Sequence, residues 1–183
     1  RGLGDVYKRQ TWYSPEANEV LIDDSTIRWM EMDTGPIQIY QEPAPGGAYV
    51  IGADTAGEGS DFNVGQVIDH ITGQQVCTIR GQMDEDLFAK QLYCLGKHYH
   101  TALVSVEANF SSYPIRELER LRYPRQYVRQ AEDSFTHRIR QSYGFKTSSV
   151  TRPLVIAGLV EVVREHPEWL NDRDTLNEML TFV

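Results

Sequence analysis

Three short segments between residues 48 and 81 have the apolar and alternating patterns of β-strands. Residues 48–54, AYVIGAD, form a mostly apolar run that ends at an aspartate, which is typical of a buried strand. Residues 62–69 alternate imperfectly between apolar and polar positions, and residues 75–81 alternate more clearly. Because only short turns separate the three runs, the pattern predicts an antiparallel meander.

Residues 84–107 predict a helix that is followed by a fourth strand. Apolar side chains recur at helical spacing and form one stripe; its members are Phe88, Leu92, Leu95 and Tyr99. Asp84 is a good N-cap residue, and we expect the helix to extend to residue 100. Residues 101–107, TALVSVE, have the pattern of a strand that ends in an acid. Since a helix connects them, this strand is expected to lie parallel to strand 48–54.

The rest of the chain predicts further helices and a short strand. We expect helices at 113–123, 151–166 and 174–183, a strand at 125–130, and a loop or hairpin at 131–149. Thr151 as N-cap and Pro153 in the first turn mark the start of the second of these helices. Its apolar face consists of Val155, Leu159, Val162 and Val163. The order of elements predicts an α/β fold with a mixed sheet (three antiparallel strands, then parallel crossover strands) and helices on both faces.

The first 46 residues show no such regular pattern. We interpret residues 1–10, RGLGDVYKRQ, as an artefact of sequencing or translation and exclude them from the fold. Residues 11–40 are polar with scattered aromatic side chains, which favours irregular or short helical structure. Residues 41–47, QEPAPGG, have the composition of a linker.

Composition places the chain among soluble globular proteins. It has 183 residues, of which 40% are hydrophobic and 24% charged, enough for one domain with a core. No apolar run approaches the roughly 20 residues that span a bilayer, so we expect no membrane partner. The chain has 2 cysteines without the spacing of a zinc site or a disulfide framework, which favours a reducing, cytosolic setting.

Charge is distributed unevenly along the chain. The net charge is −8, but residues 116–152 contain nine Lys and Arg against four acids, or +5, which leaves −13 for the remainder. This asymmetry suits an enzyme that gathers cations at one place and a polyanion beside it. On composition alone we favour the simpler interpretation, a solvated helix face with an arginine-rich loop. The candidate DNA-binding residues of the segment are Arg138, Arg140, Lys146 and Arg152.

Acidic residues stand at the ends of two strands that we expect to be parallel. Asp54 ends strand 48–54 and Glu107 ends strand 101–107, so their side chains are expected to meet at one edge of the sheet. Neighbouring carboxylates repel each other unless a cation lies between them. Carboxylate oxygens are ligands that Mg²⁺ or Mn²⁺ prefers, so one of these ions is the expected cation. Asp61 could add a third carboxylate. The residues alone leave simpler roles open. Asp54 could open a turn, Glu107 could form a salt bridge with Lys or Arg, and Asp61 could be a solvated acid in a turn.

The glycine-rich segment after Asp54 excludes several other binding loops. Counted from Asp54, an EF-hand loop would need an acid or Asn where Ala56 stands and Glu where Gly65 stands. The Gly-Lys-Ser/Thr of a P-loop is absent, and a strand rather than a helix follows the glycines, which excludes a Rossmann loop. A phosphate loop of the actin-like ATPases, which also joins two strands after an aspartate, stays open.

Four motifs resemble, in order and spacing, the C-terminal nuclease domain of the phage terminase large subunit. They are YVIGADTAGEGSDFNVGQVID, LGKHYHTALVSVEANF, TSSVTRPLVIAGLVEVV and DRDTLNEMLTFV, and the resemblance covers about residues 36–183. It implies a ribonuclease-H-like fold in residues 47–183 and a metal-dependent endonuclease that cuts concatemeric double-stranded viral DNA. It matches Asp54 and Glu107 to catalytic, metal-binding acids and Asp61 to an acid near the first metal. One or two ions of Mg²⁺ or Mn²⁺ are implied as cofactors.

The chain departs from the family pattern at both ends. It has no Walker motif, so we expect the packaging ATPase domain, which would bind ATP, to lie outside this sequence. Residues 11–46 are expected to connect that ATPase domain to the nuclease domain. The family's third acid follows in a His-Asp-Asp run, which we expect beyond Val183, and we therefore expect weak or no cleavage by this chain alone. The resemblance also implies the portal protein and the small terminase subunit as partners. It places the protein in the host cytoplasm and, transiently, at the procapsid portal.

Two alternatives remain to the endonuclease. One is a non-catalytic ribonuclease-H-like module that docks on DNA or on a portal ring. The other is an actin-like domain that hydrolyses a nucleotide, and it predicts binding of ATP.

Overall fold

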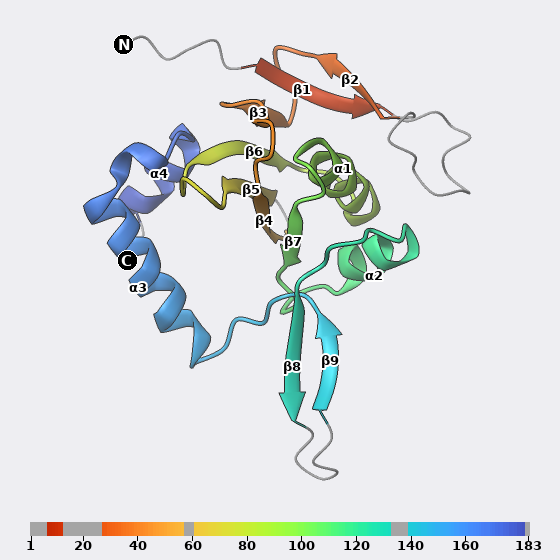
Figure 1. Ribbon diagram of the computed structural model, residues 1–183, viewed down its shortest axis with the longest axis vertical. Coiled ribbons are helices and arrows are strands. Elements are labelled where there is room, and N and C mark those ends of the chain that lie inside the picture. Colours follow the sequence, from red (N-terminus) through yellow and green to blue (C-terminus); the bar gives the residue numbers. More distant parts are fainter. Residues whose placement is uncertain (1–6, 13–26, 57–60, 133–138, 182–183) are drawn as a thin grey trace.

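A seven-stranded mixed sheet forms the centre of the molecule (Figure 1). The computed structural model describes residues 7–12, 27–56, 61–132 and 139–181. In spatial order the strands are β2 (Arg28–Glu31), β1 (Tyr7–Trp12), β3 (Ile37–Ile39), β6 (Gln75–Gly81), β5 (Asn63–Asp69), β4 (Tyr49–Asp54) and β7 (Leu103–Val106).

The pairing of the strands confirms the predicted topology. β4, β5 and β6 are antiparallel neighbours, and β7 pairs with β4 in parallel. Helix α1 (Glu85–His98) makes the crossover from β6 to β7. The fold class is therefore the predicted one, an α/β fold with a mixed sheet of the ribonuclease-H type.

One face of the sheet is covered by α1. All four side chains of the predicted helix stripe, from Phe88 to Tyr99, are fully buried. They pack in one core cluster with the sheet residues that point to the same face, among them Ile51, Val67 and Ile79. Asp84 is the N-cap, as predicted, but its backbone carbonyl rather than its side chain accepts the hydrogen bond from the N–H of Phe88.

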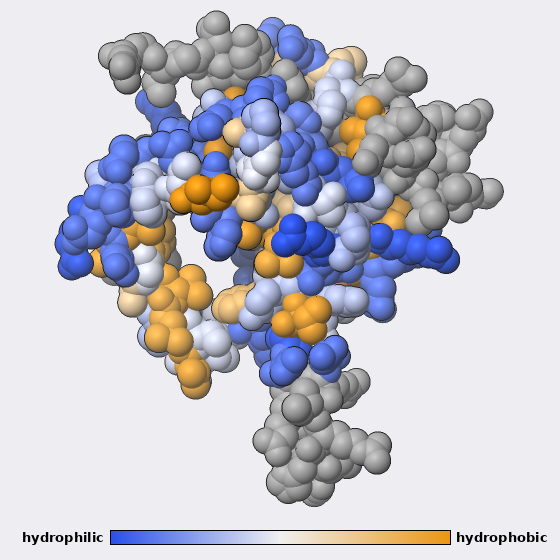
Figure 2. All heavy atoms as spheres, viewed as in Figure 1, coloured by the Kyte–Doolittle hydropathy of each residue, from blue (hydrophilic) through white to orange (hydrophobic). Residues whose placement is uncertain are grey.

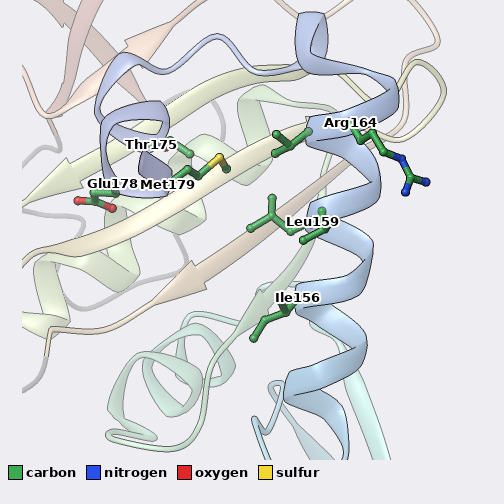
Figure 3. A pocket seen from close by; sticks show the side chains of 8 residues that line it. Ile156, Leu159, Arg164, Thr175, Glu178 and Met179 are labelled. Atoms are coloured by element: carbon green, nitrogen blue, oxygen red, sulfur yellow. The ribbon is translucent and has the colours of Figure 1, made fainter. Parts of the chain in front are cut away.

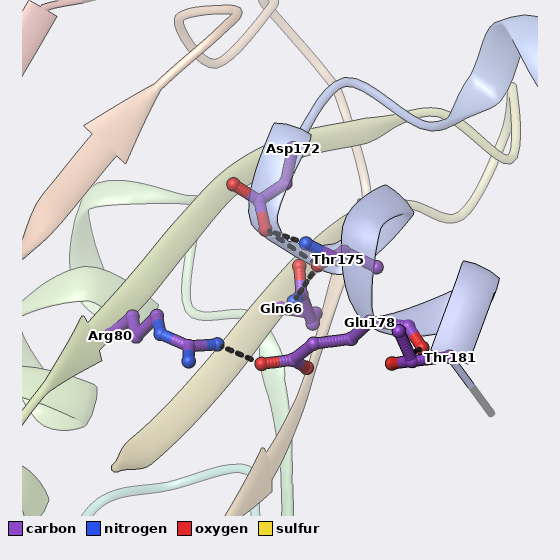
Figure 4. Close-up of polar contacts among 6 residues, drawn as sticks. All are labelled: Gln66, Arg80, Asp172, Thr175, Glu178 and Thr181. Atoms are coloured by element: carbon purple, nitrogen blue, oxygen red, sulfur yellow. Dashed lines mark hydrogen bonds and ion pairs between the residues drawn. The ribbon is translucent and has the colours of Figure 1, made fainter.

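Helix α4 (Arg173–Thr181) is attached to the opposite face by a polar network (Figure 4). The buried carboxylate of Asp172 accepts hydrogen bonds from the Tyr40 hydroxyl at 2.8 Å and from the Thr175 hydroxyl at 2.6 Å. The Gln66 amide on β5 donates to Thr175 at 3.0 Å, and Arg80 on β6 pairs with Glu178 at 2.6 Å. Helices therefore lie on both faces of the sheet.

Helix α3 (Thr151–Glu165) contributes no residue to the core. The predicted apolar face is present, but Val155, Leu159 and Val163 on it are 40 to 55% exposed. Figure 2 shows the hydrophobic side chains along this helix at the surface. Between α3 and α4 lies a cavity of about 580 Å³, into which Ile156 and Leu159 point (Figure 3). Periodicity predicts a helix and its apolar side, but not whether another element covers that side.

The N-terminal region contradicts the predicted irregular or short helical structure. Its described parts form β1, β2 and β3, and β3 joins the sheet by pairing with β6. In β3 the buried Ile37 and Ile39 alternate with Gln38, but a run of only three residues after Pro36 is too short to be recognised by its period. Residues 13–26 lie outside the described part of the chain.

A second, two-stranded sheet extends from the end of β7 (Figure 1). It consists of β8 (Val128–Glu132) and β9 (Ile139–Tyr143), which we call the hairpin. The predicted strand at 125–130 begins three residues later, as β8, and the predicted hairpin is present. Helix α2 (Tyr113–Arg120) lies between β7 and the hairpin in sequence and packs against α1. In the described part of the chain no helix has the length and apolar character needed to cross a membrane.

Candidate metal centre

Asp54 and Glu107 lie next to each other at one edge of the sheet. Asp54 is the last residue of β4, and Glu107 directly follows β7. Ala53 and Val106 are partners in the parallel register, and the N–H of Glu107 donates to the carbonyl of Ala53 at 2.8 Å. Since Ala53 and Val106 are buried on the α1 side, the next residue of each strand turns to the opposite face. Both acids therefore project from that face, at the edge of the sheet where the sequence places them together.

The two carboxyl groups interact directly. The pKa of Asp54 is raised from 3.8 to about 6, first by partial desolvation, then by the hydrogen bond and the charge repulsion with Glu107. A hydrogen bond from the backbone N–H of Thr55 opposes this rise. Asp54 is exposed and Glu107 half-buried, so both can be reached from solvent. Two carboxylates that share a proton offer adjacent oxygen ligands to a hard divalent cation.

Asn63 fixes the backbone that follows Asp54. Its buried side chain accepts a hydrogen bond from the N–H of Ala56 at 2.9 Å and donates to the carbonyl of Met83 at 2.7 Å. The start of the glycine-rich loop is thereby tied to the segment between β6 and α1. Beside it, the hydroxyl of Thr55 is buried and has no hydrogen-bond partner. Sequence reasoning missed Asn63, because its partners are known only once β5 is paired.

Asp61 lines a recess to which neither Asp54 nor Glu107 contributes. It is exposed and lines a cavity of about 380 Å³ together with Asp84 and Glu85 at the start of α1. Within the described ranges, no three His, Cys, Asp or Glu side chains are close enough to hold a metal ion together. The structure thus brings Asp54 and Glu107 together and does not add Asp61 to them.

The candidate DNA-binding residues lie on and beyond the hairpin. Lys146 and Arg152 are exposed, between β9 and the first turn of α3. Arg140 is on β9, although the structure does not describe its side chain, and Arg138 lies outside the described residues. Elsewhere in the basic segment, Arg120 forms a two-point ion pair with the buried Glu117.

Comparison with solved structures identifies the fold more closely. No protein-family model matches the chain, and neither does any curated protein sequence. The zinc-bound large terminase nuclease of the thermophilic phage G20c superposes with a TM-score of 0.61 at 19% identity, over 83% of this chain and 80% of that one. A second structure of that nuclease gives a TM-score of 0.53 at 20% identity over 72% of this chain. Its magnesium-bound form gives 0.54 at 19% identity over the same share.

The chain therefore has a ribonuclease-H-like α/β fold. Among proteins of that class, it has the fold of the large terminase nuclease domains. The chain spans 62% of the length of one of these structures and 61% of another.

Proposed function

We propose that this chain is the nuclease domain of a phage terminase large subunit. In this proposal it hydrolyses phosphodiester bonds of concatemeric double-stranded DNA with Mg²⁺ or Mn²⁺. The single observation that carries the proposal is the meeting of Asp54 and Glu107 at the carboxyl ends of two parallel strands. Crevices at this edge of α/β sheets are where ligands bind. The fold that the chain shares with the terminase nucleases supports the same conclusion.

The donor set fits a hard divalent cation. Asp54 and Glu107 provide carboxylate oxygens, which Mg²⁺ and Mn²⁺ prefer as ligands. A bound cation would stabilise the charged form of Asp54, which is disfavoured when no metal is bound. The G20c nuclease has been solved with bound magnesium, zinc and cobalt, which supports a divalent ion here. When bound, one or two such ions supply Lewis-acid activation of water and stabilisation of the leaving oxygen. Asp54 and Glu107 would hold the ions, and Asn63 would keep the loop after Asp54 in place.

The remaining parts of the proposal concern partners. Double-stranded DNA would contact the basic segment around the hairpin, where Lys146 and Arg152 are exposed. Asp61 would act as a further acid near the first metal, although it lines a recess to which neither Asp54 nor Glu107 contributes. The proposal further includes three protein partners: the portal protein, the small terminase subunit and an ATPase domain in the same polypeptide. It places the protein in the host cytoplasm and at the procapsid portal.

One observation favours a second candidate, a non-catalytic module of the same fold that docks on DNA or on a portal ring. Within the described ranges, no cluster of three acids, His or Cys stands ready to hold a metal ion. In that case Asp54 and Glu107 would be a remnant of a site, and divalent ions would bind equally to the chain and to its Asp54 variants.

Cleavage of supercoiled plasmid in MnCl₂ separates these two functions. The unmodified chain and the control Glu161→Gln, which removes a charge from exposed α3, are expected to nick the plasmid only weakly, because the third acid of the family is expected beyond Val183. Asp54→Asn and Glu107→Gln are expected to have no activity while they still bind DNA. Slow cleavage suffices, because the comparison is between variants prepared in the same way. Equal cleavage by all four proteins, or none by any of them together with equal Mn²⁺ binding, would contradict the proposed nuclease.

A further inference from the structure

A cavity of about 640 Å³ separates α2 from the hairpin. Polar side chains from both elements line it: Ser112, Arg116 and Glu119 from α2 and its N-cap, and Arg129 and Ser142 from the facing strands. The nuclease proposed above uses none of them. Two arginines and two hydroxyl groups in one hollow surface are hydrogen-bond donors that face the same space.

Arg129 carries the inference. It lies opposite Ser142 in the register of the hairpin, and its Nε donates to the Ser142 hydroxyl at 3.1 Å. Its Nη1 atom is buried and has no hydrogen-bond partner. An unpaired donor on a charged group costs more free energy than an unpaired neutral one, and such groups in native proteins call for a bound ion or water. The Ser142 hydroxyl thus holds one edge of the Arg129 guanidinium in place, and Arg129 is among the residues that line the cavity.

The surroundings of Arg129 favour an anion. Arg116 is exposed at the same cavity, and Ser112 stands at the N-cap of α2 without a side-chain capping bond. Among the described residues that line the cavity, Glu119 is the one acid, against the two arginines. The described lining therefore carries a net positive charge in a chain whose net charge is −8.

The backbone that follows Glu107 links the candidate metal centre to the wall of the cavity. Ala108, which immediately follows Glu107, lines the cavity, and its N–H donates to the carbonyl of Phe145 at 2.8 Å. Phe145 follows β9 by two residues and forms a parallel bridge with Glu107. The segment that follows β9 is therefore bonded to the strand end that carries Glu107.

We propose that the cavity between α2 and the hairpin binds a backbone phosphate of the DNA that the metal centre cleaves. Arg129, Arg116, Ser112 and Ser142 supply the donors. Arginine suits this role because its planar fork matches phosphate oxygens in two-point geometry. The proposal rests on the proposed nuclease function for the identity of the anion. Glu119 weakens the site by repulsion, and its removal is expected to tighten binding.

Fluorescence anisotropy with a labelled 20-base-pair duplex tests the site in EDTA, so that metal-dependent contacts do not contribute. Arg129→Gln is expected to weaken binding about tenfold, the effect of one charge-assisted hydrogen bond. It should also reduce the slope of log Kd against log salt concentration by about 0.9, the value for one phosphate contact. Glu119→Gln is expected to tighten binding severalfold. The matched control is Arg122→Gln, an exposed arginine just beyond α2 and outside the cavity, which removes the same charge.

Equal affinity and equal salt slope for Arg129→Gln and Arg122→Gln would overturn the phosphate site. If Arg129→Gln lowers the Tm of the chain, the Glu119→Gln variant provides the test, because it leaves Arg129 in place. Unchanged DNA affinity in Glu119→Gln would also overturn the phosphate site. The Asp54→Asn variant keeps the two proposals apart. Loss of DNA affinity in Arg129→Gln would support the phosphate site, and absence of Mn²⁺-dependent cleavage together with Mn²⁺ binding that Asp54→Asn leaves unchanged would refute the nuclease.

Discussion

Replacing Asp54 by Asn is expected to stabilise the metal-free protein while it removes the candidate metal site. At pH 8 Asp54 is charged, and burial together with the hydrogen bond and charge of Glu107 raises its pKa to about 6, so the folded chain disfavours the charged form. The amide of Asn has nearly the same shape, carries no charge and can donate a hydrogen bond to Glu107. The substitution therefore removes a repulsion that is specific to the folded chain.

The magnitude follows from the pKa. A rise from 3.8 to about 6 corresponds to at most about 3 kcal/mol, at 1.36 kcal/mol for each pKa unit. Because Asp54 is exposed, solvent screening reduces this figure, and we expect about 1 kcal/mol. For a chain of 183 residues that corresponds to an increase in Tm of about 2–4 °C.

The pH dependence has a definite sign. The folded-state pKa of Asp54 lies above the unfolded value, so its proton stabilises the folded chain below about pH 4. This contribution is lost as the pH rises through about 6. Near pH 4 the side chain at position 54 is uncharged in both proteins, and their Tm values should therefore converge.

Thermal unfolding followed by circular dichroism measures both effects. In EDTA at pH 8, Asp54→Asn should unfold at a higher temperature than the unmodified chain, and the Glu161→Gln control should not. Mn²⁺ at about 100 times its dissociation constant should stabilise the unmodified chain by about 2.7 kcal/mol and leave Asp54→Asn unchanged. A lower Tm for Asp54→Asn in EDTA at pH 8, or the same shift at pH 4 as at pH 8, would refute the reasoning.

Three further substitutions test the fold around the site. Gly144 has φ +84°, and a Cβ there would contact Ile115 and lie 2.8 Å from the Val106 carbonyl oxygen. Gly144→Ala should therefore lower the free energy of unfolding, measured in urea, by about 1–3 kcal/mol. An unchanged urea midpoint would contradict this prediction. Asp172→Ala removes the acceptor for Tyr40 and Thr175 and should cost about 2 kcal/mol, with hydrogen exchange accelerated in α4. Retained protection of α4 would show that other contacts hold it. Leu154 is 69% exposed on α3, so Leu154→Gln should change stability by less than about 0.5 kcal/mol, and a loss of several kcal/mol would mean that this face is covered.

The parts of the fold that depend on local periodicity could be predicted from the sequence. The stripe from Phe88 to Tyr99 specifies which side of α1 is buried, because apolar side chains at helical spacing leave one solution. The apolar run that ends at Asp54 and the strand that ends at Glu107 specify the edge of the sheet, since a helical crossover makes them parallel. These two inferences sufficed to bring the two acids together.

Other features depend on contacts between residues far apart in the sequence. Tyr40 and Asp172, which are 132 residues apart, fix α4 to the sheet, and neither residue has a local signal for that role. Ile37 and Ile39 join the sheet in a strand too short to show a period. Asp61 lines a recess to which neither Asp54 nor Glu107 contributes, and no local pattern in the sequence indicates that.

The location of a bound metal ion tests the central claim most directly. Crystals of the chain soaked in MnCl₂ would show Mn²⁺ by its anomalous scattering. We predict a peak about 2.1 Å from carboxylate oxygens of both Asp54 and Glu107, the distance typical of a small divalent ion. The same soak of Asp54→Asn should show no peak there. A peak only in the recess of Asp61, Asp84 and Glu85, or none beside Asp54 and Glu107, would contradict the claim that these two acids form the metal centre.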